Sequence, residues 1–150
     1  MDRESKQFRH LAEFAPNGLA LIDNTGKFCY INPKFKELFG YDLDEIPNGK
    51  EWFKRAYPDE ADRKRAIHTW IYDSKGSKPG EKRPRTFTVT RKDGSKRVIK
   101  FVAVTLEDGY ELLTCEDITT RIKAKEDLKA AHDHLLGIID FLPDATFVID

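Results

Sequence analysis

YINPKFKELFGYDLDEI, residues 30–46, joins a strand to a short helix, and both ends of that helix are marked in the sequence. Asn32 is followed by proline, and this pair predicts a helix start, since asparagine caps helices well and proline is favoured at the first helical position. We expect the helix to end at Gly40. Asp42 and Glu45 have the spacing of a capping box and predict a further helical turn.

Upstream of this stretch, the sequence predicts a helix and then a hairpin. Residues 3–15 carry apolar side chains at helical spacing, and the Pro-Asn-Gly run at 16–18 ends that helix. LALID at 19–23 and KFCYI at 27–31 are short strands that an Asn-Thr-Gly turn connects.

Downstream, helices come first and strands follow. RTFTVTRK alternates between apolar and polar residues, and the Asp-Gly pair after it is a strong hairpin signal. The pattern predicts an α+β protein with an antiparallel sheet. The expected elements are a short helix around Trp52, a helix at 59–74, a loop at 74–84, strands at 85–92, 96–106 and 110–118, and a helix at 120–140.

The last of these helices is charged but has an apolar seam. Its apolar residues are spaced alternately by four and three, as in the heptads of a coiled coil. The run is shorter than three heptads, so an ordinary amphipathic helix is the alternative. The seam consists of Ala124, Leu128, Ala131, Leu135, Ile138 and Leu142.

Composition excludes several classes of protein. The chain has 150 residues, 39% of them hydrophobic, with 26 basic and 26 acidic side chains. This length suits one domain with its own core, and the zero formal charge argues against nucleic acid as a partner. The N-terminus is charged and lacks an apolar signal core, so we expect a cytoplasmic protein without membrane contact. Two cysteines are too few for a disulfide framework.

The chain repeats its own beginning at its end. FAPNGLALID at 14–23 matches FLPDATFVID at 141–150 in its Phe, Pro and Ile-Asp positions, all at one offset. Internal similarity of this kind indicates a repeated module. We therefore expect 141–150 to begin a second copy, and the chain to be a fragment of a longer tandem-module protein.

The order of elements and three motifs resemble the PAS domain, or sensory box, a module of signalling proteins. YINPKFKELFGYDLDEI resembles the early signature of that family, and RKDGSKR at 91–97 resembles its hairpin before the penultimate strand. EDITTR at 116–121 resembles the Asp-Ile-Thr motif that joins the last strand to an output helix. The resemblance implies the PAS fold: a five-stranded antiparallel sheet with short helices on one face, an N-terminal helix and a C-terminal linker helix.

The resemblance also implies a division of the chain and a strand order. The expected parts are an N-terminal helix at 1–15, the PAS domain at 16–118, a signalling helix at 119–140 and the truncated second PAS domain at 141–150. The family's strand order places the first strand between the second and the fifth. Cys29 and Cys115 would then be about 10 Å apart, too far for a disulfide, so we expect free thiols.

No motif in the sequence predicts catalysis or a metal site. His132 lacks the nearby proline of a histidine-kinase phosphoacceptor, and His132 and His134 lie on different faces of a helix, so they cannot share a metal. In haem-binding relatives a histidine on the long helix binds iron, but His68 lies about a turn too late, so haem is not expected. Flavin photochemistry through a cysteine adduct is excluded, because residues 40–75 contain no cysteine.

The resemblance implies an apolar cavity between the long helix and the inner face of the sheet. The cavity either holds a small organic ligand or is filled by its own aromatic rings. Arg83, Arg85 and Lys100 are candidates for binding an anionic ligand, with a solvated surface as the alternative. The candidate lining consists of Phe28, Phe35, Phe39, Ile67, Trp70, Ile71, Phe87, Phe101, Ala103, Leu113 and Cys115.

The penultimate strand is apolar on both faces, so we expect its outer face to be covered. The cover is the N-terminal helix, the same surface of a second subunit, or both together, which we favour; scattered exposed valines are the alternative. The residues expected in helix packing or dimerisation are Phe8, Leu11, Phe14, Val102, Val104, Leu112 and, on the exit helix, Leu128.

Asp117, Thr119 and Arg121 lie where the sheet meets the exit helix, and we expect them to couple the two. The sequence thus predicts a sensory input module that binds a small ligand or relays a signal through a dimeric helix to a downstream output domain. The chain itself is not expected to be an enzyme. The expected parent is a bacterial or archaeal sensor histidine kinase. The alternatives are a diguanylate cyclase parent and a cofactor-free dimerisation module.

Overall fold

The computed structural model describes residues 3–76 and 78–141. The chain divides into two compact units after Asp117. The elements in chain order are α1 (Arg3–Glu13), β1 (Gly18–Ile22), β2 (Phe28–Ile31), α2 (Pro33–Phe39), α3 (Gly49–Ala56), α4 (Glu60–Gly76), β3 (Lys82–Thr90), β4 (Lys96–Thr105), β5 (Glu111–Asp117) and α5 (Thr119–Phe141).

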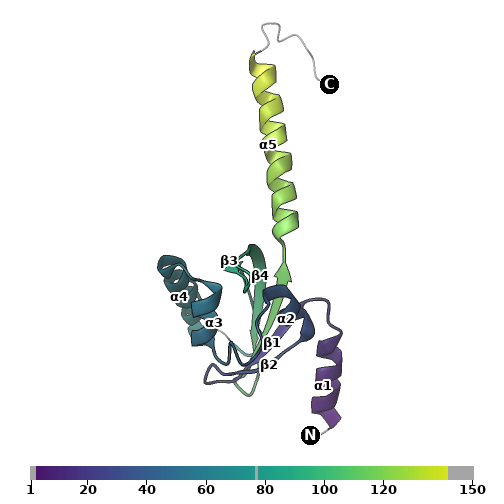
Figure 1. Cartoon of the computed structure of the whole chain (residues 1–150), viewed down its shortest axis with the longest axis vertical. Coiled ribbons are helices and arrows are strands. Elements are labelled where there is room, and N and C mark those ends of the chain that lie inside the picture. Colours follow the sequence, from purple (N-terminus) through teal and green to yellow (C-terminus); the bar gives the residue numbers. More distant parts are fainter. Residues whose placement is uncertain (1–2, 77, 142–150) are drawn as a thin grey trace. The chain divides into compact units, whose positions relative to one another are not determined.

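The five strands form one sheet in the order β2-β1-β5-β4-β3, with every neighbouring pair antiparallel. The first strand lies between the second and the fifth, as expected, and both cysteines are free. Figure 1 shows α3 and α4 together on one side of the sheet, away from α1. The α+β class and the five-stranded antiparallel sheet are therefore confirmed.

The first strand after α4 begins earlier than predicted. β3 starts at Lys82, inside the expected loop, and pairs with β4 from there. Pro84 lacks an N–H and argued against a strand, but β3 is an edge strand, where a missing donor can face solvent. The connection between α4 and β3 is therefore shorter than the sequence suggested.

The stretch at 30–46 folds as its caps predict. The Asn32 side chain accepts a hydrogen bond from Phe35 N at 2.9 Å, and α2 ends at Gly40, whose φ of 84° is left-handed. Asp42 N donates to Glu45 Oε1 at 3.1 Å, as in a capping box, although the segment forms a turn and no helix.

The core lies between the inner face of the sheet and helices α2, α3 and α4. Its centre is a group of rings from Phe35, Phe39, Trp52 and Phe101, whose centroids lie 4.7 to 6.4 Å apart. All four side chains are buried. Aromatic rings in such contacts stabilise one another beyond the area that they bury.

Asn32 also joins four segments beneath this core. Its side chain is fully buried, and Oδ1 accepts from Leu19 N at 2.8 Å as well as from Phe35 N. Nδ2 donates to Ala12 O at 2.8 Å and to Asn17 O at 3.0 Å. One side chain thus holds the end of α1, the following connector, β1 and α2 together.

α1 lies against β2, so its expected packing on the penultimate strand is corrected. Phe8 makes an edge contact with Tyr30, with ring centroids 5.9 Å apart. Ala12 is buried, but Leu11 and Phe14 are 73% and 76% exposed. Each helical residue turns by about 100°, so with Ala12 held inward, neither Leu11 nor Phe14 faces the sheet.

The second unit contains α5, which we describe by itself. Apolar side chains of α5 are exposed among charged ones: Leu128 is 73% exposed and Leu135 is 55% exposed. Residues 142–150, nearly all of the predicted second module, lie outside the described part of the chain. None of the helices in the described ranges has the length and hydrophobicity needed to span a membrane.

Candidate functional site

An apolar cavity lies between α3 and α4 on one side and the inner face of the sheet on the other. Its volume is about 30 Å³. This is enough for one or two water-sized molecules. The residues that line it are Ile22, Phe28, Trp52, Phe53, Tyr57, Ala66, Trp70, Phe87, Phe101 and Leu113.

The structure brings only part of the predicted lining to this cavity. Phe28, Trp70, Phe87, Phe101 and Leu113 lie in its wall. The remaining buried members of the predicted set belong to the packed core beside it. These are Phe35, Phe39, Ala103 and Cys115.

Two predicted lining residues are corrected. Ile71 is 49% exposed and Ile67 is half-buried outside the cavity wall. α4 presents Ala66 and Trp70 to the cavity instead. These two lie four positions apart on one helix face, so the prediction misplaced that face by one residue.

The residues that the sequence missed come mainly from α3 and the segment after it. Trp52, Phe53 and Tyr57 line the cavity together with Ala66 and Ile22. Trp52 and Phe53 were recognisable as an apolar helix face, but nothing local showed which element they would meet. Burial raises the pKa of Tyr57 far above its usual value, so its hydroxyl stays neutral in the wall.

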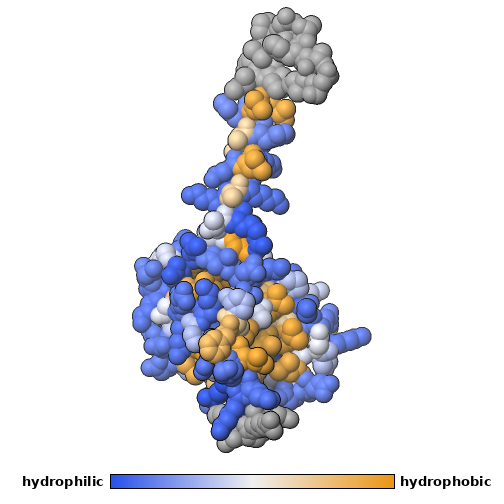
Figure 2. Space-filling view, turned by 90° about the vertical axis from the view of Figure 1, so that its right-hand side faces the viewer, coloured by the Kyte–Doolittle hydropathy of each residue, from blue (hydrophilic) through white to orange (hydrophobic). Residues whose placement is uncertain are grey.

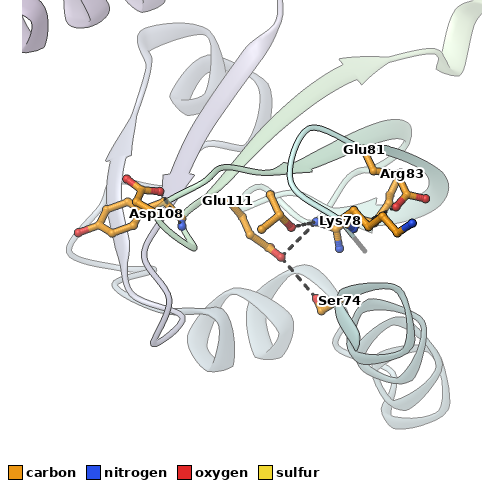
Figure 3. Close-up of polar contacts among 8 residues, drawn as sticks. Ser74, Lys78, Glu81, Arg83, Asp108 and Glu111 are labelled. Carbon is orange, nitrogen blue, oxygen red and sulfur yellow. Dashed lines mark hydrogen bonds and ion pairs between the residues drawn. The ribbon is translucent and has the colours of Figure 1, made fainter. Parts of the chain in front are cut away.

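A polar cluster lies on the same sheet face, where β3 begins (Figure 3). Arg83 Nη2 donates to Thr105 Oγ1 at 2.9 Å and to Glu111 Oε1 at 3.2 Å. Ser74 Oγ, near the end of α4, donates to the same Glu111 oxygen at 3.4 Å. The cluster therefore connects the C-terminal end of α4 with β3, β4 and β5.

The three candidate cations have different surroundings. Arg83 is buried, whereas Arg85 forms a two-point ion pair with Asp73 of α4 at 2.7 and 2.6 Å. This arginine lowers the pKa of Asp73 below its usual value. Lys100 is exposed on the opposite face of the sheet, so it is not available to the cavity.

An ion pair lies at the end of the sheet that precedes α5. Arg97 Nε, on β4, donates to Asp117 Oδ2 at 2.7 Å. Asp117 is the last residue of β5, and Thr119 is the first residue of α5. Of the three predicted coupling residues, Asp117 is thus tied to the neighbouring strand by a charge-assisted hydrogen bond.

The outer face of the sheet is only half covered in the single chain. Val102, Val104 and Leu112 are partly exposed, and they lie on adjacent strands. Figure 2 looks onto the side of the first unit where α1 lies and shows apolar surface there between hydrophilic rims. The helix leaves Leu11 and Phe14 exposed next to it.

Residues 6–73 match a protein-family model described as "PAS domain". The fold, with its sheet order and flanking helices, is the PAS fold, and the match of residues 6–73 to the PAS family model agrees with it.

Solved structures share this fold. The PAS domain of an HTR-like protein from Haloarcula marismortui is 23% identical, with a TM-score of 0.59 over 77% of this chain and 92% of that one. A domain of a sensory box sensor histidine kinase/response regulator from Geobacter sulfurreducens is 24% identical, with a TM-score of 0.59 over 76% and 94%.

A third similar structure comes from a different class of parent. The N-terminal domain of a diguanylate cyclase with PAS/PAC sensor from Marinobacter aquaeolei is 18% identical, with a TM-score of 0.59 over 70% of this chain and 97% of that one. A comparison with curated proteins finds no match. At these identities the likeness shows the fold.

Proposed function

We propose that this chain is a PAS domain, that it is the cytoplasmic input module of a sensor histidine kinase, and that it acts as a homodimer. In this proposal, a change in the first unit reaches the output domain through α5, and the chain itself carries no catalytic step. The likeness to the Geobacter sulfurreducens kinase domain supports this parent. The Marinobacter aquaeolei domain makes a diguanylate cyclase the second candidate.

The observation that carries the relay is the ion pair between Arg97 and Asp117. It joins β4 to the last residue of β5, directly before α5 begins. A shift of β4 would therefore act on the last residue of β5, two positions before α5 begins. Because the two side chains are only 32% and 22% exposed, their contact is better protected from solvent than a surface pair.

Replacing Asp117 tests the relay in the full-length protein that contains this domain. Asp117→Ala is expected to abolish most of the stimulus-dependent change in output and to cost less than about 1.5 kcal/mol of domain stability. The measurements are output activity with and without stimulus, and urea unfolding of the isolated domain.

A charge exchange is the matched control. Arg97→Asp combined with Asp117→Arg keeps the pair in reverse and is expected to recover part of the response, whereas either single change is not. Normal switching in Asp117→Ala would contradict the relay.

A cofactor-free dimerisation module is a second candidate function, favoured by the small cavity. A volume of about 30 Å³ leaves no room for a drug-sized ligand unless α4 moves away from the sheet. Native mass spectrometry of the purified domain separates the two functions, since a retained organic ligand supports sensing inside the cavity. A dimer without ligand supports the cofactor-free module.

A further inference from the structure

We propose that Arg83 anchors a small carboxylate ligand at the end of the inner sheet face where β3 begins. This site is distinct from the apolar cavity, because Arg83 is not part of the cavity wall. The proposal does not depend on the relay through α5, since it concerns binding alone.

The first argument is the burial of a guanidinium group with unused donors. Arg83 is 8% exposed, and only its Nη2 donates to described residues, namely Thr105 and Glu111. Nε and Nη1 are buried, and no acceptor for them exists in the ranges 3–76 and 78–141. A guanidinium has five N–H donors, and buried donors in native proteins are nearly always paired with an acceptor.

The second argument is the contrast with Arg85, two positions along the same strand face. Arg85 has a complete structural ion pair, since two of its nitrogens donate to the two carboxylate oxygens of Asp73. Arg83 meets Glu111 at a single nitrogen, and Glu111 shares that oxygen with Ser74. Figure 3 shows Glu111 between Arg83 and Ser74. A structural role for Arg83 would be served by a two-point pair, which Glu111 does not provide.

The third argument is the space and charge beside Arg83. A polar hollow of about 430 Å³ is lined by Arg83, Lys82, Arg85, Asp73 and Glu81, among others. Small-molecule sites have volumes of this order. Asp73 is already neutralised by Arg85, and the Glu81 carboxylate accepts a hydrogen bond from the Lys78 N–H at 3.0 Å. The hollow therefore favours a small anion.

A carboxylate fits these donors better than other anions of similar size. It is planar, like guanidinium, and its two oxygens accept several hydrogen bonds from a fixed fork of donors. Chloride has one acceptor centre and cannot use that geometry. We therefore assign small organic acids as the ligand class.

The experiment follows the Nε–H signal of Arg83 by ¹⁵N–¹H NMR, with the signal assigned by its loss in Arg83→Lys. Sodium acetate and sodium succinate are titrated into the whole chain, and sodium chloride and inorganic phosphate are titrated at matched ionic strength. We expect a saturable shift of this signal with the carboxylates and a rise in Tm. The rise in Tm should be absent in Arg83→Lys, which lacks the signal itself.

Glu111→Gln is the decisive variant, because it keeps the size of the side chain and removes the charge that competes with the ligand. It is expected to lower the Kd for succinate by about tenfold. Glu107→Gln removes an equal charge from the exposed turn before β5, outside the hollow, and should change the Kd by less than about threefold. This pair of variants keeps the proposal testable even if Arg83→Lys fails to fold.

Three results would overturn the proposal. The first is an equal shift of the Arg83 signal with chloride, which indicates a general salt effect. The second is saturable binding of phosphate alone, which indicates an oxyanion site without the assigned ligand class. The third is unchanged or weaker succinate binding in Glu111→Gln.

Discussion

Asn32 shows how strongly one buried side chain can stabilise the fold of this protein. It makes four hydrogen bonds to the backbone of Ala12, Asn17, Leu19 and Phe35. Asn32→Ala leaves these buried groups unpaired and removes the cap of α2. We expect a loss of roughly 2–4 kcal/mol in the free energy of unfolding, measured by urea denaturation.

Asn48→Ala is the matched control, since Asn48 caps α3 in the same way but is exposed. It should cost only about 1 kcal/mol. Equal losses in the two variants would show that the additional hydrogen bonds of Asn32 contribute nothing beyond the cap.

For single residues, the sequence predicts the local contacts but misses the long-range ones. Asn32 and Gly40 were recognisable as the caps of α2, because each acts on residues next to it in the chain. The hydrogen bonds from Asn32 to Ala12 and Asn17 could not be predicted, since they depend on where α1 packs. The buried position of Arg83 was missed for the same reason, because it depends on how close α4 ends to the sheet.

α4 is an element tied to the sheet by polar contacts at its C-terminal end. Asp73 pairs with Arg85, and Ser74 contacts Glu111. Trp70 packs on the cavity one turn earlier. Movement of α4 away from the sheet therefore requires these polar contacts to break.

The Asp73–Arg85 pair predicts acid sensitivity at this element. The pKa of Asp73 is lowered from 3.8 by the arginine. Its contribution to stability is therefore present above about pH 4 and is lost as pH falls through the lower, folded-state pKa. Asp73→Asn should be less stable than wild type at pH 7, and the difference should shrink as the pH falls below the ordinary pKa of 3.8.

Urea unfolding across this pH range measures the effect. Asp44→Asn, the same change at an exposed carboxylate outside α4, should follow the wild-type curve. A constant difference between Asp73→Asn and wild type at every pH would exclude the ion pair as its cause.

The sequence predicted some boundaries and inward faces of helices and strands correctly and misplaced others. The helices and hairpins were found because their caps and turns are local signals. The start of β3 was misplaced, because Pro84 is tolerated only by virtue of the edge position that β3 takes in the finished sheet. The inward face of α4 was misplaced by one residue, since both Trp70 and Ile71 are apolar and only the fold decides which one is buried.

For the whole molecule, the proposed homodimer depends on apolar side chains that a single chain leaves exposed. On α5, Leu128 and Leu135 are one heptad apart, and both are more than half exposed. Leu128→Lys should weaken self-association at least about tenfold, because it places a charge in the proposed seam. Sedimentation equilibrium measures the dimer constant.

Ala130→Lys is the control for this change, since Ala130 is exposed and lies off the seam. It should leave the dimer constant within about twofold. Equal weakening by both substitutions, or a wild-type chain that stays monomeric at high concentration, would contradict a dimer built on this seam.

The sheet order also determines when the domain can complete its fold. β1 pairs with β2, its neighbour in sequence, but on its other side with β5, the last strand in the described part of the chain. A ribosome must therefore release Asp117 before the edge of the first hairpin is closed. Such long-range pairing slows folding. Until then the half-built hairpin presents an open strand edge, and the nascent chain is most exposed to mispairing during synthesis of the segment between β2 and β5.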